Sequence, residues 1–129
     1  GNPKKINHPY YALGDESLLA ACIDLGMQQG IIATNAGFYA PQGRHLRTQK
    51  VVDSDNHHLS QFKYNNSVIT NFDMETAGIY GLSRVLGHKA ISVSAILANR
   101  INGTFSKNPD QAVHEMIATV TSAIKEGKL

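Results

Sequence analysis

The sequence predicts an α/β fold, a sandwich of helices around a partly parallel sheet, and two observations predict it. Segments with helical periodicity alternate with short apolar runs, in the order helix, strand, strand, helix, strand, helix. One run, residues 90–98, is apolar on both faces apart from its serines, which is typical of a strand covered on both sides. A chain of 129 residues is long enough for one domain and too short for two, so residues 1–129 are expected to form a single domain.

The first part of the chain predicts a helix, a strand and a loop. The helix begins after Asp15, a good N-cap, and ends at Gly26. Its apolar face is formed by Leu18, Leu19, Cys22, Ile23 and Leu25. Ile31–Thr34 has the length and composition of a short strand, and residues 37–43, rich in Gly, Pro and aromatic residues, predict a loop.

The remaining elements are two strands and two helices. Residues 45–66 are polar and give little signal beyond a possible short helix near residue 60. Val68–Phe72 is a candidate strand, and a helix is expected over about residues 75–86, stopped by Gly87. After the strand at 90–98, Asn108 and Pro109 open the last helix. Its apolar positions are Val113, Met116, Ile117, Val120 and Ile124.

Three strands make a thin sheet. Either more strands lie within residues 45–66, or the sheet is completed elsewhere. The chain opens with Gly1 rather than Met, which indicates a tag scar, a processed product or a piece of a longer protein.

The composition excludes several classes of protein. The chain is 42% hydrophobic and 17% charged with a net charge of +2, too weak to indicate a nucleic-acid or membrane-surface partner. The single cysteine, Cys22, cannot form an internal disulfide. No apolar run approaches the roughly 20 residues of a membrane-spanning helix, and the N-terminus has no signal-peptide core. We therefore expect a cytoplasmic protein.

Several reactive side chains have ordinary explanations. His57 and His58 are adjacent, so their side chains point to different faces, and no Cys or His cluster has zinc spacing. We expect no metal site. Cys22 lies on an apolar helical face with no neighbouring charge, so a core thiol is expected rather than a nucleophile.

The loop at residues 37–44 carries an aromatic pair, an amide and a guanidinium. One interpretation is a solvated turn with its aromatic side chains tucked beneath it. The other is a site for a flat ligand, in which Phe38 stacks on a heterocycle while Gln42 and Arg44 bind its edge. Such groups belong on loops at the carboxyl ends of strands in α/β sheets.

Two more segments place polar groups at strand ends. In residues 71–75, Asp73 can be a helix N-cap and Glu75 an acid of the first turn. In the functional interpretation, Glu75 binds a vicinal diol and Met74 packs on the sugar. The third segment, residues 97–100, closes the strand at 90–98 with Asn99 and Arg100.

In this order, the three segments resemble the uridine phosphorylase branch of the nucleoside phosphorylase family. The resemblance is carried by Phe38-Tyr39 with Gln42 and Arg44, by residues 71–77, and by Asn99-Arg100. It runs from about residue 15 through the last helix, and three motifs in order are more specific than any one alone. It implies a three-layer α/β/α sandwich with a mixed central sheet.

The resemblance also implies roles for individual residues. Phe38 would stack on the base, while Gln42 and Arg44 would bind the uracil edge and stabilise its leaving-group charge. Met74 and Glu75 would hold the ribose, Glu75 through the 2′- and 3′-hydroxyls. The remaining substrate-binding residues would be Asp73, in contact with the sugar or with the surrounding structure, Leu97 and Ala98 as a wall of the base pocket, and Arg100 behind Arg44. Of these, Arg44, Gln42 and Glu75 would act in catalysis.

The implied reaction is phosphorolysis of a pyrimidine nucleoside to base and ribose 1-phosphate, with inorganic phosphate as co-substrate and no cofactor. Purine-specific and nucleosidase members carry an Asp near the end of the last strand, where this chain has Ala98-Asn99-Arg100, so a pyrimidine is favoured. There are two departures. Asp73 stands where the family usually has Glu, and Thr34-Asn35-Ala36 stands where relatives often show Ser and Asp.

The family's fold is longer than this chain, and its N-terminal half supplies the phosphate loop, the phosphate-binding arginines and several strands. The resemblance therefore implies a C-terminal portion that is incomplete on its N-terminal side and inactive alone. Its expected partners are that missing half and further copies, as a dimer or a trimer of dimers. A non-catalytic nucleoside-binding module of the same fold, and a related purine nucleoside phosphorylase or nucleosidase, are the alternatives.

Overall fold

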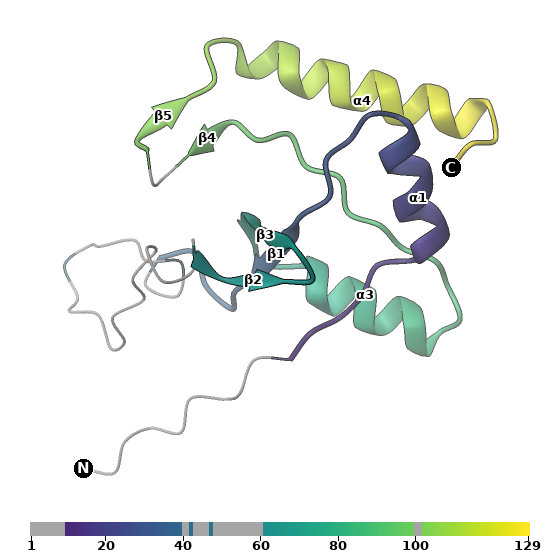
Figure 1. Ribbon diagram of the computed structural model, residues 1–129, viewed down its shortest axis with the longest axis horizontal. Coiled ribbons are helices and arrows are strands. Elements are labelled where there is room, and N and C mark those ends of the chain that lie inside the picture. The colour runs from purple at the N-terminus through teal and green to yellow at the C-terminus, as the bar shows by residue number, and fades with distance from the viewer. Residues whose placement is uncertain (1–9, 40–41, 43–46, 48–60, 100–101) are drawn as a thin grey trace.

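The computed structural model describes residues 10–39, 42, 47, 61–99 and 102–129, and within them it has three helices and two small sheets (Figure 1). The helices are α1 (Glu16–Asp24), α3 (Thr76–Val85) and α4 (Pro109–Lys125). The strands are β1 (Ile31–Thr34), β2 (Lys63–Tyr64), β3 (Ser67–Asp73), β4 (Ala98–Asn99) and β5 (Thr104–Phe105). The predicted α/β class is confirmed.

The larger sheet is mixed and has β3 at its centre. β1 pairs with β3 in parallel, β2 pairs with β3 antiparallel, and the order is β1-β3-β2. Asn65 and Asn66 join β2 to β3 as a two-residue turn, with φ of 46° and 64°, a left-handed conformation that asparagine tolerates. Residues 45–66 show little local pattern, and β2 is one strand that lies within them.

All three helices end in the same hydrogen-bonded motif. A glycine with positive φ follows each C-cap: Gly26 at 85°, Gly87 at 73° and Gly127 at 68°. The next residue donates its N–H back to a carbonyl of the last helical turn, in the pairs Met27 to Cys22, His88 to Ser83 and Lys128 to Ala123. This is the Schellman motif, which glycine adopts without the steric cost that a Cβ would add. The predicted stops at Gly26 and Gly87 are confirmed.

The helix beginnings differ in how they are capped. The Asp15 carboxylate accepts hydrogen bonds from the N–H groups of Ser17 and Leu18, which confirms the predicted N-cap of α1. Asn108 occupies the N-cap position of α4 but makes no side-chain capping bond. Its amide donates to Gln111 Oε1 at 2.8 Å instead, so the N-terminal N–H groups of α4 are not capped by it.

The strand predicted over residues 90–98 is wrong for most of its length. Only Ala98 and Asn99 form a strand, and they pair with β5 in a short hairpin that the sequence did not predict. A strand requires a neighbouring backbone, and this segment bonds elsewhere: Ala90 O accepts from Asp15 N–H, and Ser92 N–H donates to the Tyr80 hydroxyl. Figure 1 shows the segment crossing the molecule as an irregular chain between α3 and β4.

Few side chains of the described residues are buried. Cys22 (4% exposed) and Ala123 are the buried apolar ones, and burial of Cys22 confirms the predicted core thiol. Three apolar side chains of α3 and that of its C-cap Leu86, by contrast, are exposed: Ile79, Leu82, Val85 and Leu86. In Figure 1, α4 runs along the top of the molecule, and α3 lies lower, beside the larger sheet. The three-layer sandwich itself stays a prediction.

Candidate active site

The candidate site lies at one edge of the larger sheet, where β1 and β3 end. Thr34, the last residue of β1, is paired in register with Asp73, the last residue of β3. Because the two strands are parallel, the loop after Thr34 and the junction after Asp73 leave the same edge of the sheet. The N–H of Asn35 donates to the carbonyl of Asp73 at 2.9 Å and carries the pairing one residue further. Phe38 and Glu75 therefore follow neighbouring strand ends.

The aromatic pair stands in the loop after β1. The rings of Phe38 and Tyr39 meet edge to face, with centroids 5.3 Å apart and an interplanar angle of 89°. Phe38 is 48% exposed, so about half of its side chain stays accessible to a ligand. The N–H of Gln42 donates to the Tyr39 carbonyl at 3.0 Å, and Gln42 itself is only 3% exposed. Gln42 is thus a buried polar residue next to an accessible aromatic one.

Glu75 and Met74 occupy the turn between β3 and α3. Glu75 is at the N-cap position, makes no capping bond, and accepts a hydrogen bond from the N–H of Met74 at 3.0 Å through Oε2. Both side chains are exposed. A carboxylate is stabilised there by the positive end of the helix dipole, and carboxylate oxygens can accept hydrogen bonds from hydroxyl groups.

Asp73 is held by side chains of two other elements. Its Oδ1 accepts from the Thr34 hydroxyl at 2.7 Å, and its Oδ2 accepts from the Thr76 N–H at 3.1 Å and from the Thr76 hydroxyl. Burial of Asp73 raises its pKa, but the hydrogen bonds from Thr76, Thr34 and the Glu75 backbone outweigh burial and hold the pKa below the ordinary value of a carboxyl. Asp73 is therefore a half-buried carboxylate held by hydrogen bonds from two other elements.

Leu97 and Ala98 lie at the far end of the segment that was predicted as a strand. Ala98 pairs with Phe105 in the small hairpin, and the carbonyl of Leu97 accepts from the N–H of Ser106 at 2.8 Å. The same segment approaches the site edge earlier, at Ser92 and Ser94, which lie within hydrogen-bond distance of Thr76 and Asn71. A contact of Leu97 and Ala98 with the base stays a prediction.

The two predicted arginines, Arg44 and Arg100, lie outside the described residues. Their roles stay predictions that rest on the sequence. The described residues hold no group of three or more metal-ligating side chains. Among the same residues, no helix has the length and apolar character to cross a bilayer.

Comparison with known proteins identifies the family. The sequence profile described as the phosphorylase superfamily matches residues 2–126. The chain belongs to the phosphorylase superfamily. It is also 32% identical over 99 residues to the uridine phosphorylase of Thermococcus kodakarensis, a match that covers 70% of this chain and 33% of that protein. The chain thus spans about a third of the length of this relative, and no solved structure gives a significant match.

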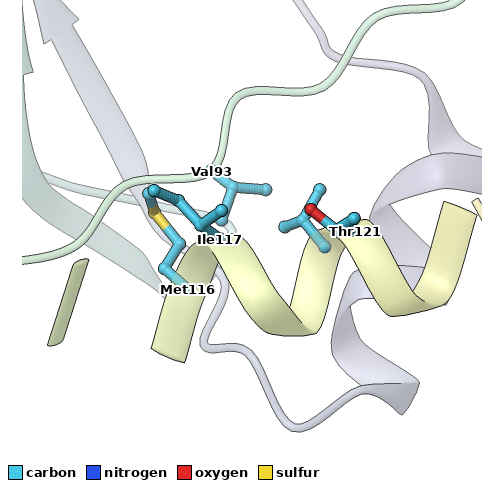
Figure 2. A pocket seen from close by; sticks show the side chains of 5 residues that line it. Val93, Met116, Ile117 and Thr121 are labelled. Atoms are coloured by element: carbon cyan, nitrogen blue, oxygen red, sulfur yellow. The ribbon is translucent and has the colours of Figure 1, made fainter. Parts of the chain in front are cut away.

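Two hollows of this phosphorylase-superfamily chain lie away from the predicted site. Figure 2 shows the first, of about 220 Å³, in which Val93 faces side chains of α4 that include Met116, Ile117 and Thr121. The second, of about 370 Å³, lies beside the start of α1 and the end of α3. Its lining combines the basic Arg84 and Lys89 with the acidic Asp15 and Glu16, so the two signs of charge balance. Neither hollow is lined by a predicted site residue.

Sequence reasoning missed the side chains that hold Asp73. Thr34 and Thr76 were not proposed as functional residues. The interpretation of Asp73 as a helix N-cap did anticipate a bond from the start of α3, and the N–H of Thr76 makes that bond. The bond to Thr34 depends on strand pairing across 39 residues, which no local pattern reports.

Proposed function

We propose that this chain carries the base- and ribose-binding side of a nucleoside phosphorylase site, and that its ligand is a pyrimidine nucleoside. The observation that carries the proposal is the shared edge of β1 and β3, from which an accessible aromatic ring and an exposed carboxylate both emerge. Membership of the phosphorylase superfamily and the match to a uridine phosphorylase support the chemical class.

The proposed reaction is attack of phosphate on the sugar, which gives the free base and ribose 1-phosphate. The glycosidic bond loosens first, so the sugar gains positive character and the base gains negative charge. Gln42 and Arg44 would donate hydrogen bonds to that charge, and fixed donors shielded from water stabilise a transition state best. Glu75 would hold the 2′- and 3′-hydroxyls, and Phe38 would stack on the base.

The direct test is titration of the chain with uridine, followed by nuclear magnetic resonance of its backbone amides. Binding should shift the amides of the loop after β1 and of residues 74–76. Phe38→Ala should weaken binding about tenfold, because stacking of a base on an aromatic ring contributes about 1–3 kcal/mol. Phe105→Ala is the matched control, since Phe105 is an exposed aromatic residue on the other sheet.

Glu75→Gln tests the sugar contact independently. It keeps the size of the side chain and removes the charge, so uridine should bind about tenfold weaker while 2′,3′-dideoxyuridine is unaffected. The site assignment is wrong if uridine shifts no amide resonance at this edge of the sheet. It is also wrong if Phe105→Ala lowers the affinity for uridine as much as Phe38→Ala does. Adenosine binding more tightly than uridine would favour the purine alternative.

Phosphate separates an enzyme site from a binding module. If a phosphate site is present in the assembly under test, uridine and phosphate should change each other's affinity by the same factor. We expect the isolated chain to bind uridine without such coupling and to catalyse no phosphorolysis. Turnover by the chain alone would overturn this expectation and place the phosphate site within it.

A further inference from the structure

Four side chains form a connected cluster beneath the candidate site: Thr34, Asp73, Thr76 and Ser92. We call it the Asp73 cluster. Thr34 donates to Asp73 and also accepts from the N–H of Ala77 at 3.1 Å. The hydroxyl of Thr76 bonds Asp73 and lies 3.3 Å from the hydroxyl of Ser92. The cluster thus joins the end of β1, the end of β3, the start of α3 and the segment after it.

Most of the acceptor capacity of Asp73 is used within the protein. A carboxylate offers about four lone-pair positions. Three donors bond Asp73: the hydroxyls of Thr34 and Thr76, and the N–H of Thr76. Thr76 is 6% exposed, so the donors on that side are shielded from solvent. A ligand hydroxyl would have to compete with these donors for the carboxylate.

We propose that Asp73 is a positioning residue, which fixes Glu75 and the Phe38 loop relative to each other and does not contact the ligand. The inference rests on the proposed function for the roles of Glu75 and Phe38. It replaces the ligand contact that the sequence suggested for Asp73. Thr34 acts through the same bond, since it immediately precedes the loop that carries Phe38.

The connectivity would let one carboxylate act on both halves of the site. Glu75 lies in the chain between Asp73 and Thr76, and hydrogen bonds from Thr76 to the Asp73 carboxylate close a turn around it. On the other side, the Asn35 N–H binds the Asp73 carbonyl while Thr34 binds its side chain. Loss of the carboxylate would free the turn at residues 74–75 and the start of the loop after β1 together.

The test uses hydrogen exchange of single amides, without ligand. Asp73→Asn replaces one acceptor oxygen by a donor, so the Thr76 amide should exchange at least about tenfold faster, as for loss of a charged hydrogen bond. Thr34→Val should accelerate the Ala77 amide directly and the Thr76 amide through Asp73. Thr34→Ser keeps the hydroxyl and should restore both, while Thr70→Val removes an exposed hydroxyl of β3 outside the cluster and should change neither.

Uridine affinity then separates positioning from contact. If Asp73 positions the site, Thr34→Val and Asp73→Asn should lower the affinity for uridine by similar factors. The double variant should be no weaker than the worse single variant, because both changes break one unit. Weaker binding with Asp73→Asn alone would show ligand contact and overturn the proposal.

The two proposals fail in distinguishable ways. If the wild-type chain does not bind uridine, the proposed function fails, and exchange still decides the cluster. The positioning role of Asp73 would be overturned if the Thr76 and Ala77 amides exchange at unchanged rates in Asp73→Asn and Thr34→Val. If Asp73→Asn does not fold, comparison of Thr34→Val with Thr34→Ser carries the same decision.

Discussion

The burial of Cys22 determines the reactivity of its thiol. The side chain is 4% exposed, and burial raises the pKa of its thiol, so the reactive thiolate is scarce at neutral pH. We expect a disulfide reagent to modify it slowly in the folded chain and rapidly in urea. Fast modification under native conditions would contradict its place in the core.

Substitution of Cys22 separates stability from binding. Cys22→Ala should lower the free energy of unfolding by about 1 kcal/mol, and Cys22→Ser by more, because it buries a hydroxyl. Neither should change uridine affinity, whereas Arg44→Ala should weaken it. Urea unfolding and uridine titration of the three variants provide the comparison, and equal loss of affinity in all three would sink the role of Arg44.

Two carboxylates make stability depend on pH. The hydrogen bonds from Ser17 and Leu18 lower the pKa of Asp15, and those from Thr76 and Thr34 lower the pKa of Asp73 against the effect of burial. A carboxyl with a lowered folded pKa contributes its stability above its unfolded pKa of about 4, and this is lost as pH falls through the folded pKa.

The chain should therefore lose stability as pH falls below about 4, and Asp73→Asn should lose less over the same interval. Urea midpoints measured between pH 7 and the acid limit of folding give the comparison. Parallel losses in wild type and Asp73→Asn would mean that Asp73 titrates normally.

At the scale of elements, α3 offers a matched pair of glycines. Gly87 has a φ of 73° after the helix, whereas Gly81 lies inside it, and an added Cβ would meet nothing within 4 Å at either position. Only backbone conformation then distinguishes them. Gly87→Ala should destabilise by roughly 1–2 kcal/mol, and Gly81→Ala should stabilise by roughly 0.5–1 kcal/mol. Urea unfolding of both variants checks the opposite signs; equal signs would contradict the Schellman assignment.

Elements that rest on local signals were predicted well. Glycine stops, the Asp15 cap and short apolar runs each act within a few residues, and α1, β1, β3 and α3 follow them. The strand predicted over residues 90–98 was wrong for most of its length. Apolar character favours a strand, but a strand forms only where a neighbouring backbone is available for pairing. In the site, the residue types indicated a candidate ligand site from the sequence alone. The Thr34–Asp73 hydrogen bond could not be predicted, because it depends on the register of β1 and β3.

At the scale of the whole molecule, the exposed side of α3 should dominate behaviour in solution. Its stripe of Ile79, Leu82, Val85 and Leu86 is open to solvent, with Val85 84% exposed. Such surface binds apolar dyes and promotes association. We expect the chain to enhance the fluorescence of anilinonaphthalene sulfonate and to sediment faster at higher concentration.

Leu82→Lys should reduce both effects. The charge-matched control is Gln111→Lys on α4, at an exposed polar position, which should leave both unchanged. If the two variants behave alike, net charge rather than the α3 stripe controls association.

The irregular course of residues 90–97 has a consequence for handling the protein. This stretch is mostly apolar, and no strand of the described residues pairs with it. Another chain could therefore pair with it through backbone hydrogen bonds. Ser92 and Ser94 are the polar residues that interrupt the stretch. We expect the double variant Ser92→Val, Ser94→Val to aggregate faster on standing than the unchanged chain, because its apolar run is then continuous.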